Sequence, residues 1–130
     1  MKIFAEIGLN HLGNSRLAID LVKKCLKHDI DGITLQIQPE SYYDSSKNFR
    51  RDLNIKAYRK ISSIVKKSKK LFGLAIMDIK TMEKYNDIRF DFFKILSLAF
   101  QDAKLIKKVI NTKKKIFLST GFSNLQSIVS

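Results

Sequence analysis

The sequence contains few of the residues that cross-link or interrupt a chain. Its 130 residues include one cysteine, one proline and five glycines, and no tryptophan. The single cysteine, Cys25, excludes a disulfide within the chain, and its place on an apolar helical stripe favours a small core residue over a nucleophile. The scarcity of proline and glycine argues against a flexible linker. We therefore expect residues 1–130 to form one domain.

Long hydrophobic runs are also missing. No window of the sequence approaches the ~20 apolar residues that a membrane-spanning helix needs. The first residues lack the basic region, apolar run and small-residue cleavage site of a secretion signal. The expected location is therefore the cytoplasm, and no membrane partner is expected.

Acidic residues are half as frequent as basic ones. The chain has 12 Asp and Glu against 25 Lys and Arg, which gives a formal net charge of +13. Many lysines cluster where helices are predicted to end, and the helix dipole favours cations there. These clusters are Lys23, Lys24 and Lys27; Lys66, Lys67, Lys69 and Lys70; Lys107 and Lys108; and Lys113, Lys114 and Lys115. No nucleic-acid-binding motif or interleaved aromatic residue accompanies them, so we expect weak attraction to anions rather than a nucleic-acid partner.

Apolar segments of two kinds alternate along the chain. Short apolar runs predict strands at residues 2–8, 32–38, 71–77, 90–96 and 115–118. Between the strands, apolar residues at helical spacing predict helices. The first begins at Asn14 or Ser15, the next three cover residues 54–68, 79–86 and 102–111, and a fifth begins near Asn124. Residues 40–52 are predicted to form a polar loop. The alternation is typical of an α/β fold with a parallel sheet covered by helices.

Polar residues stand where the predicted strands end, and the carboxyl ends of parallel strands meet on one side of the sheet. They are Glu6, Asn10 and His11; Thr34, Gln36 and Gln38; Asp78; Lys94 and Ser97; and Ser119, Thr120 and Gly121. Lys94 lies inside an apolar strand, where a lysine is costly to bury unless an anion or carboxylate meets it. Two interpretations are open. Either these residues form an anion site, or Lys94 pairs with Glu6 or Asp78 and binds nothing.

Four segments carry a resemblance to a known family. They are Ala5-Glu6-Ile7-Gly8-Leu9-Asn10-His11-Leu12-Gly13, Leu71-Phe72-Gly73-Leu74-Ala75-Ile76-Met77-Asp78, Phe93-Lys94-Ile95-Leu96-Ser97 and Lys115-Ile116-Phe117-Leu118-Ser119-Thr120-Gly121-Phe122. Together they resemble the sialic acid (N-acetylneuraminate) synthase family, including the separation between Ser97 and Ser119. The resemblance implies a partial (β/α) TIM-type barrel of about five parallel strands that ends before strands 6–8.

The resemblance also implies a reaction. The family condenses phosphoenolpyruvate with an N-acetylated amino sugar such as N-acetylmannosamine, with a divalent metal, manganese or magnesium, polarising the aldehyde. Carried over by motif, Lys94, Ser97 and Ser119 would bind phosphoenolpyruvate, and Glu6 would be the catalytic carboxylate facing the sugar. The residues that would shape the site are Asn10, His11, Gln36, Thr120 and Gly121.

The sequence departs from the family pattern at several positions. Thr34 stands where the family has a second lysine, Ala99 where it has an acidic residue, and Ile76 where it has a proline. The family's metal-binding histidines lie on strands 6–8, so no metal ligand is expected within this chain. One hypothesis is a fragment or truncated synthase, inactive alone and completed within a longer chain, by self-association or by a complementary half-barrel. The alternative is a degenerate, non-catalytic half-barrel that serves as a binding or scaffold protein.

Overall fold

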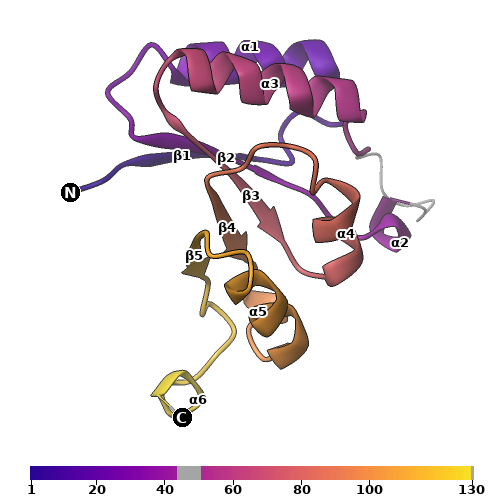
Figure 1. Cartoon of the computed structure of the whole chain (residues 1–130), viewed down its shortest axis with the longest axis vertical. Coiled ribbons are helices and arrows are strands. Elements are labelled where there is room, and N and C mark those ends of the chain that lie inside the picture. The colour runs from indigo at the N-terminus through magenta and orange to yellow at the C-terminus, as the bar shows by residue number, and fades with distance from the viewer. Residues whose placement is uncertain (44–50, 130) are drawn as a thin grey trace.

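The computed structural model describes residues 1–43 and 51–129, and strands and helices alternate along them (Figure 1). The strands are β1 (Phe4–Gly8), β2 (Gly32–Gln36), β3 (Leu71–Ile76), β4 (Phe92–Ile95) and β5 (Lys115–Leu118). The helices are α1 (Ser15–Cys25), α2 (Glu40–Tyr43), α3 (Ile55–Lys67), α4 (Ile79–Lys84), α5 (Ala103–Ile110) and α6 (Leu125–Val129), with a 3₁₀ turn, η1, at Ser97–Ala99. None of these helices is long and apolar enough to cross a membrane.

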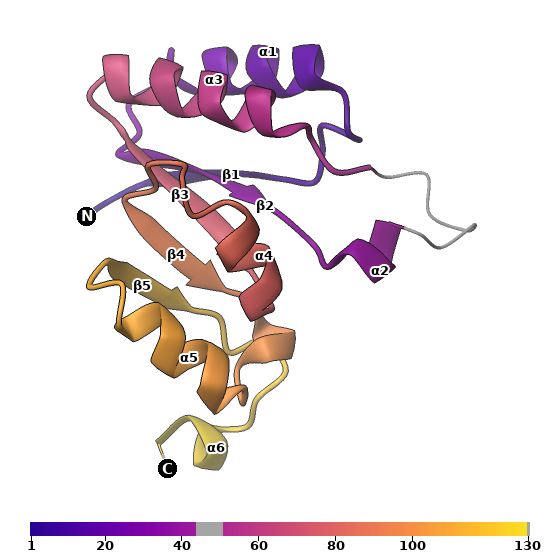
Figure 2. The ribbon, with the colours of Figure 1, turned by 45° about the vertical axis from the view of Figure 1, so that its right-hand side comes forward.

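The five strands form one parallel sheet in the order β1-β2-β3-β4-β5. Figure 2 shows that the sheet curls from β1 round to β5, with α1, α3, α4 and α5 on its outer, convex side. Each longer helix begins where a side chain accepts hydrogen bonds from its first free N–H groups. Asn14 caps α1, Asn54 caps α3, Asp78 caps α4 and Asp102 caps α5.

The main core lies between the convex side of the sheet and the helices. Alternate strand residues point outward into it, and the fully buried ones include Ile33, Leu35, Phe72, Leu74 and Ile95. Helices α1 and α5 contribute Val22, Leu105 and Val109, which are also fully buried. This face therefore has the helix-covered character that the alternation of elements predicts.

The concave side of the sheet is filled differently. Small residues on the middle strands leave room for large rings, and a Cβ on Gly73 would lie 2.0 Å from the Phe92 ring. The rings of Phe4, Phe92 and Phe117 pack edge to face, with centroids 5.1 to 5.2 Å apart. Phe4 is on the first strand and Phe117 on the last, so side chains from the two sheet edges touch across the interior. A barrel of about eight strands has an interior that is just wide enough for side chains to fill. The five parallel strands curve in this way, which confirms the predicted partial barrel.

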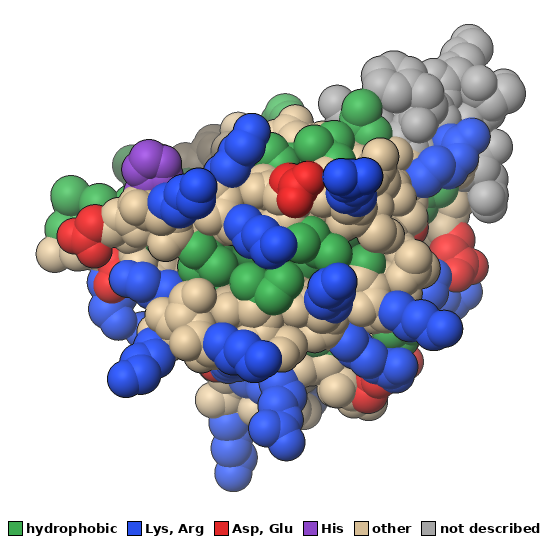
Figure 3. Space-filling view, turned by 90° about the horizontal axis from the view of Figure 1, so that it is seen from above, with side chains coloured by type: hydrophobic (Ala, Val, Ile, Leu, Met, Phe, Trp, Pro, Cys, Tyr) green, Lys and Arg blue, Asp and Glu red, His purple; other side chains and the backbone are tan. Residues whose placement is uncertain are grey.

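Two short elements depart from the sequence prediction. The loop predicted at residues 40–52 begins with the one-turn helix α2, and the serine after β4 opens the 3₁₀ turn η1. Four of the five strands are also shorter than the predicted apolar runs; for example, β2 ends at Gln36 and β4 starts at Phe92. The fifth strand spans Lys115–Leu118, as predicted. Viewed from above, Lys and Arg side chains are spread over the outer surface of α1 and α3, around a central group of hydrophobic side chains (Figure 3).

Candidate functional site

An ion pair crosses the concave side of the sheet near the carboxyl ends of the strands. The Lys94 Nζ on β4 donates to the Glu6 Oε2 on β1, and the two side chains are 27% and 40% exposed. Beside them lies a cavity of about 170 Å³, lined by this pair, Thr34 and the three rings Phe4, Phe92 and Phe117. Of the two predicted carboxylate partners of Lys94, the structure selects Glu6, because both Asp78 oxygens bond to Thr81 at the start of α4.

Thr34 lies on β2 as the register neighbour of Glu6 and is 3% exposed. The family's second lysine would therefore stand directly beside the Glu6–Lys94 pair. Among the residues that the structure describes, Lys94 is the single cation that lines this cavity. One carboxylate and one ammonium leave the lining without net charge, which weakens its attraction for an anion.

The loops after β4 and β5 come together at the same end of the sheet. The Ser97 Oγ lies 3.7 Å from the position that a Cβ on Gly121 would occupy. The Ser119 N–H donates to the Ile95 carbonyl at 3.0 Å, which continues the β4–β5 pairing beyond the strands. Ser97, Ser119 and Thr120 are all partly exposed. Their side chains are therefore accessible to solvent at this end of the sheet, and their role in binding a ligand stays a prediction.

Residues after β1 have mainly local roles. The Asn10 Nδ2 donates to the Ile7 carbonyl at 2.9 Å, which stabilises the turn that leaves the strand. Gly8 adopts a φ of +59°, and a Cβ there would lie 3.9 Å from the Gln36 Oε1. Gln36 therefore reaches over Gly8 at the rim of the site. The structure brings Glu6, Gln36 and Gly8 to this rim, while Asn10 shapes the loop behind it.

His11 is completely buried in the β1–α1 loop. Its Nδ1 accepts a hydrogen bond from the Gly13 N–H at 3.0 Å, so the neutral ring carries its proton on Nε2. That Nε2 has no hydrogen-bond partner among the described residues. Burial lowers the pKa of His11, and the charge of Asp52 opposes this shift only in part. These contacts agree with a structural, site-shaping role.

A divalent metal needs a cluster of ligands, and the chain does not offer one in the part that the structure describes. No group of three or more His, Cys, Asp or Glu side chains in residues 1–43 and 51–129 is arranged to hold an ion. His11 uses its acceptor nitrogen within its own loop. The donor set present here therefore does not fit the metal that the family uses.

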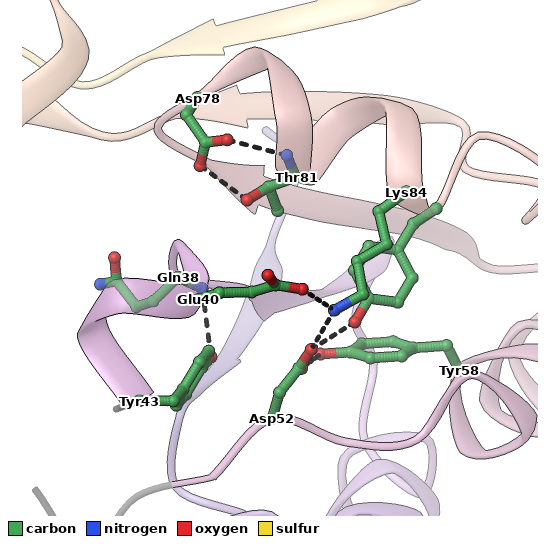
Figure 4. Close-up of polar contacts among 9 residues, drawn as sticks. Gln38, Glu40, Tyr43, Asp52, Tyr58, Asp78, Thr81 and Lys84 are labelled. Carbon is green, nitrogen blue, oxygen red and sulfur yellow. Dashed lines mark hydrogen bonds and ion pairs between the residues drawn. The ribbon is translucent and has the colours of Figure 1, made fainter. Parts of the chain in front are cut away.

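A second polar cluster, which the sequence did not predict, holds the segment after α2 against α4 (Figure 4). Its centre is Asp52, whose carboxylate accepts hydrogen bonds from the hydroxyls of Tyr58, at 2.8 Å, and Tyr85. The Lys84 Nζ lies 3.8 Å from the same carboxylate and 3.0 Å from Glu40. Burial raises the pKa of both tyrosines, and Asp52 adds to the shift. The sequence places both tyrosines on inward stripes, and two buried hydroxyls require such a partner.

Beside this cluster is a larger cavity of about 470 Å³. It lies between the segment after β2 and helix α4, and its lining includes Gln38, Glu40, Asp78, Lys80 and Thr81. Tyr43 borders this region, where its hydroxyl accepts a hydrogen bond from the Gln38 N–H at 3.1 Å. Burial raises the pKa of Tyr43 to about 12. Lys84 pairs with Glu40 and lies near Asp52, so the cluster joins helix α4 to α2 and to the residues just before α3.

Sequence comparisons connect this geometry to known proteins. The chain is 29% identical over 134 residues to an uncharacterized protein of Methanocaldococcus jannaschii, covering 97% of this chain and 39% of that protein. It is 26% identical over 146 residues to the N,N'-diacetyllegionaminic acid synthase of Campylobacter jejuni, covering 97% of this chain and 44% of that enzyme. The chain thus spans less than half the length of these relatives.

Solved structures share the fold. The N-acetylneuraminic acid synthetase of Leptospira borgpetersenii superposes with a TM-score of 0.84 at 21% identity, over 98% of this chain and 47% of that one. The spore coat polysaccharide biosynthesis protein SpsE of Bacillus subtilis gives a TM-score of 0.82 at 16% identity, over 98% and 38%. A sequence model of the NeuB family matches residues 18–130. With that match over most of its length, the chain belongs to the NeuB family, whose members include sialic and legionaminic acid synthases of carbohydrate biosynthesis.

Proposed function

We propose that this chain forms the phosphoenolpyruvate-binding part of a nonulosonic acid synthase barrel. Lys94 pairs with Glu6, as the non-binding interpretation expects, so the observation that carries the proposal is the remaining exposure of Lys94. Its side chain is 27% exposed and lines a cavity on the concave side of the sheet, near the strand ends from which the loops of Ser97 and Ser119 leave.

Ser97 and Ser119 do not line the cavity of Lys94, and Ser97 lines a separate pocket with Phe100 and Phe122. The proposed ligand would therefore extend from Lys94 to the serine hydroxyls, and a lysine with serine hydroxyls suits a ligand that carries both a phosphate and a carboxylate. The cytoplasmic location expected from the sequence is where such a substrate would be available.

The proposed reaction joins phosphoenolpyruvate to the open-chain aldehyde of an N-acetylated amino sugar such as N-acetylmannosamine. The methylene carbon of the enol bonds to the aldehyde carbon, water adds to the resulting cation, and phosphate leaves. In this scheme Lys94 holds negative charge on phosphoenolpyruvate, and Ser97 and Ser119 donate hydrogen bonds to it. Glu6 orients the Lys94 ammonium and accepts hydrogen bonds from the sugar. Gln36, Thr120 and Gly121 border the ligand.

The complete reaction would also need groups that the described residues do not supply. The family's reaction uses manganese or magnesium to polarise the aldehyde, and no donor cluster here fits such an ion, so no step is assigned to it. The chain covers 38% to 47% of the relatives compared here. We propose that further βα units, in a longer chain, a complementary half-barrel or another copy, complete the barrel along the edges of β1 and β5 that the described residues leave unpaired.

One observation favours a different function, that of a non-catalytic binding or scaffold half-barrel. Thr34 leaves the cavity lining without net charge, and Ala99, at the position of the family's acidic residue, is 5% exposed and packs into the core. Both changes remove charge from the site. A protein that has lost these charges would keep the shape of the site and a weak affinity for anions, but it would not catalyse the reaction.

Titration calorimetry with phosphoenolpyruvate tests the site. We expect weak binding to the wild type and a loss of about tenfold to a hundredfold in Lys94→Ala, because a hydrogen bond to a charged group contributes roughly 1.5–3 kcal/mol. Lys104→Ala is the matched control, since it removes the same charge from an exposed position on α5. Absence of heat with the wild type, or equal losses in both variants, would reject the site. Both the incomplete synthase and the non-catalytic half-barrel are expected to release no phosphate as the chain alone, so calorimetry tests the binding site and not turnover.

A further inference from the structure

The outer face of α1 and α3 carries a concentration of positive charge that the proposed synthase site does not use. On α3, Lys56, Lys60 and Lys67 recur at spacings of four and seven residues and form one exposed stripe. On the neighbouring helix, Arg16 and Lys23 are exposed at a spacing of seven, and Lys27 follows four residues later. Figure 3 looks onto this face and shows basic side chains spread across it. We call these six residues the basic face.

Acidic residues are scarce on the basic face. Asp20 is the one acidic residue in α1, and α3 has none. The described carboxylates that contact α3 already have partners there: Asp87 pairs with Arg59, Asp91 pairs with Lys66, and Asp52 accepts a hydrogen bond from the Tyr58 hydroxyl. No ion pair within residues 1–43 and 51–129 involves any of the six residues of the basic face. Their charges are therefore left for an external partner.

The helix dipole explains only some of these cations. Lys23 and Lys67 lie in last turns, where positive charge is favourable, but Arg16 and Lys56 occupy the second position of their helices. Positive charge is unfavourable there, and Lys56 and Lys60 also repel each other at a spacing of four residues. The cations Arg16, Lys56 and Lys60 therefore lower the stability of their helices slightly, so helix stability does not explain why they are there.

The capping residues show the same bias. The two helices of the basic face begin with the uncharged caps Asn14 and Asn54, whereas α4 and α5, away from this face, begin with Asp78 and Asp102. An aspartate cap would complement the helix dipole better than asparagine does. Negative charge is therefore missing from this face at its caps as well as in its helix interiors.

From this charge distribution we infer that the basic face docks the chain onto an anionic lipid bilayer. This revises the expectation of no membrane partner, which rested on the lack of a membrane-spanning run, because peripheral docking by charge needs no such run. The two helices lie side by side and form a broad surface rather than a single protruding helix that enters a groove (Figures 1 and 3). Neither helix exposes an aromatic ring on which bases stack, since Tyr58 is fully buried. Leu17, which is 37% exposed, adds an apolar contact among the cations. Mobile anionic headgroups can gather beneath such a face without specific reading groups.

Vesicle binding by the full chain tests the inference. Each lysine near an anionic bilayer contributes about 1 kcal/mol, which is about fivefold in affinity. The triple variant Lys56→Gln, Lys60→Gln, Lys67→Gln should therefore bind vesicles of phosphatidylglycerol and phosphatidylcholine in equal parts about a hundredfold more weakly than wild type. The matched control is Lys104→Gln, Lys107→Gln, Lys113→Gln, which removes the same charge from α5 and its following turn. It should bind nearly as well as wild type, because salt screens distant charges.

Three results would overturn the inference. One is equal loss in the two triple variants, which would assign binding to net charge alone. Another is equal binding of the wild type to pure phosphatidylcholine vesicles. The third is tighter binding of the wild type to duplex DNA than to the anionic vesicles at the same ionic strength, which would assign the face to nucleic acid. All three differ from a failure of phosphoenolpyruvate binding, which concerns Lys94 on the opposite side of the sheet.

Discussion

Replacing Thr34 by lysine should restore anion affinity to the concave cavity. Thr34 is the register neighbour of Glu6, and a lysine there brings a second ammonium to the carboxylate that now pairs with Lys94 alone. The three side chains together would then carry a net charge of one positive unit instead of zero. We therefore expect Thr34→Lys to bind phosphoenolpyruvate more tightly than the wild type does.

The size of the gain follows from the exposure of the groups. A hydrogen bond to a fully desolvated charge contributes roughly 1.5–3 kcal/mol. Glu6 and Lys94 are 40% and 27% exposed, so solvent screening reduces the benefit. We expect about 1 kcal/mol, or about fivefold in affinity. Burying the longer side chain at a position that is 3% exposed should lower the free energy of unfolding by roughly 1–2 kcal/mol.

Calorimetry on the wild type, Thr34→Lys and Thr34→Met separates the effect of the added charge from the effect of the longer side chain. Thr34→Met introduces a side chain of similar length without charge, so it should lose stability without gaining affinity. The gain in Thr34→Lys should also shrink as salt is added, because its origin is electrostatic. Equal affinities for the lysine and methionine variants, or weaker binding by the lysine variant, would refute the assignment of Thr34 to the missing charge.

Four other outcomes are expected. Asp52→Ala should lower the free energy of unfolding by roughly 2–4 kcal/mol and Tyr85→Phe by about 1 kcal/mol in urea titrations, because the alanine leaves two buried hydroxyls unpaired. The folded-state pKa of His11 lies below its ordinary value of 6.5, so stability should fall as the pH drops below about 6.5. His11→Asn keeps an acceptor for the Gly13 N–H and should remove this loss of stability at low pH. If the pH dependence of stability is unchanged in the variant, other groups cause the loss. The 130-residue chain should self-associate or unfold easily through its unpaired strand edges, whereas a monodisperse monomer with cooperative unfolding would contradict this. With manganese, phosphoenolpyruvate and N-acetylmannosamine it should release no phosphate above background, and Thr34→Lys should not change that.

The order of strands and helices could be predicted because the apolar periodicity is clear. Helix α3 was predicted at 54–68 and spans Ile55–Lys67 with Asn54 as its cap, so the pattern located it closely. The predicted strand at 90–96 shortens to Phe92–Ile95, because apolar residues also pack where the backbone no longer pairs with a neighbour. The one-turn helix α2 is too short for a periodic pattern to reveal it.

Parts of the site depend on distances that a sequence pattern does not contain. Residue type and strand position predicted that Lys94 needs an anion or a carboxylate. The curl of the sheet decides that its partner in the chain is Glu6, 88 residues away. The same curl brings Phe4 onto Phe117 from opposite edges. The hydrogen bond from the Tyr85 hydroxyl to Asp52 joins residues 33 positions apart. No sequence motif includes both residues, so the sequence did not indicate that they would meet.

The shape of the sheet also affects how much Lys94 should contribute to phosphoenolpyruvate binding when further strands close the barrel. The rings of Phe4 and Phe117 already meet, so the aromatic end of the interior is filled by five strands alone. At the other end, the Glu6–Lys94 pair is still partly open to water, which screens it. Strands added along β1 and β5 would exclude that water and strengthen every interaction that Lys94 makes with an anion. Lys94→Ala should therefore weaken phosphoenolpyruvate binding more in a closed barrel than in the five-stranded chain. An equal loss in both would show that the screening of this pair does not limit binding.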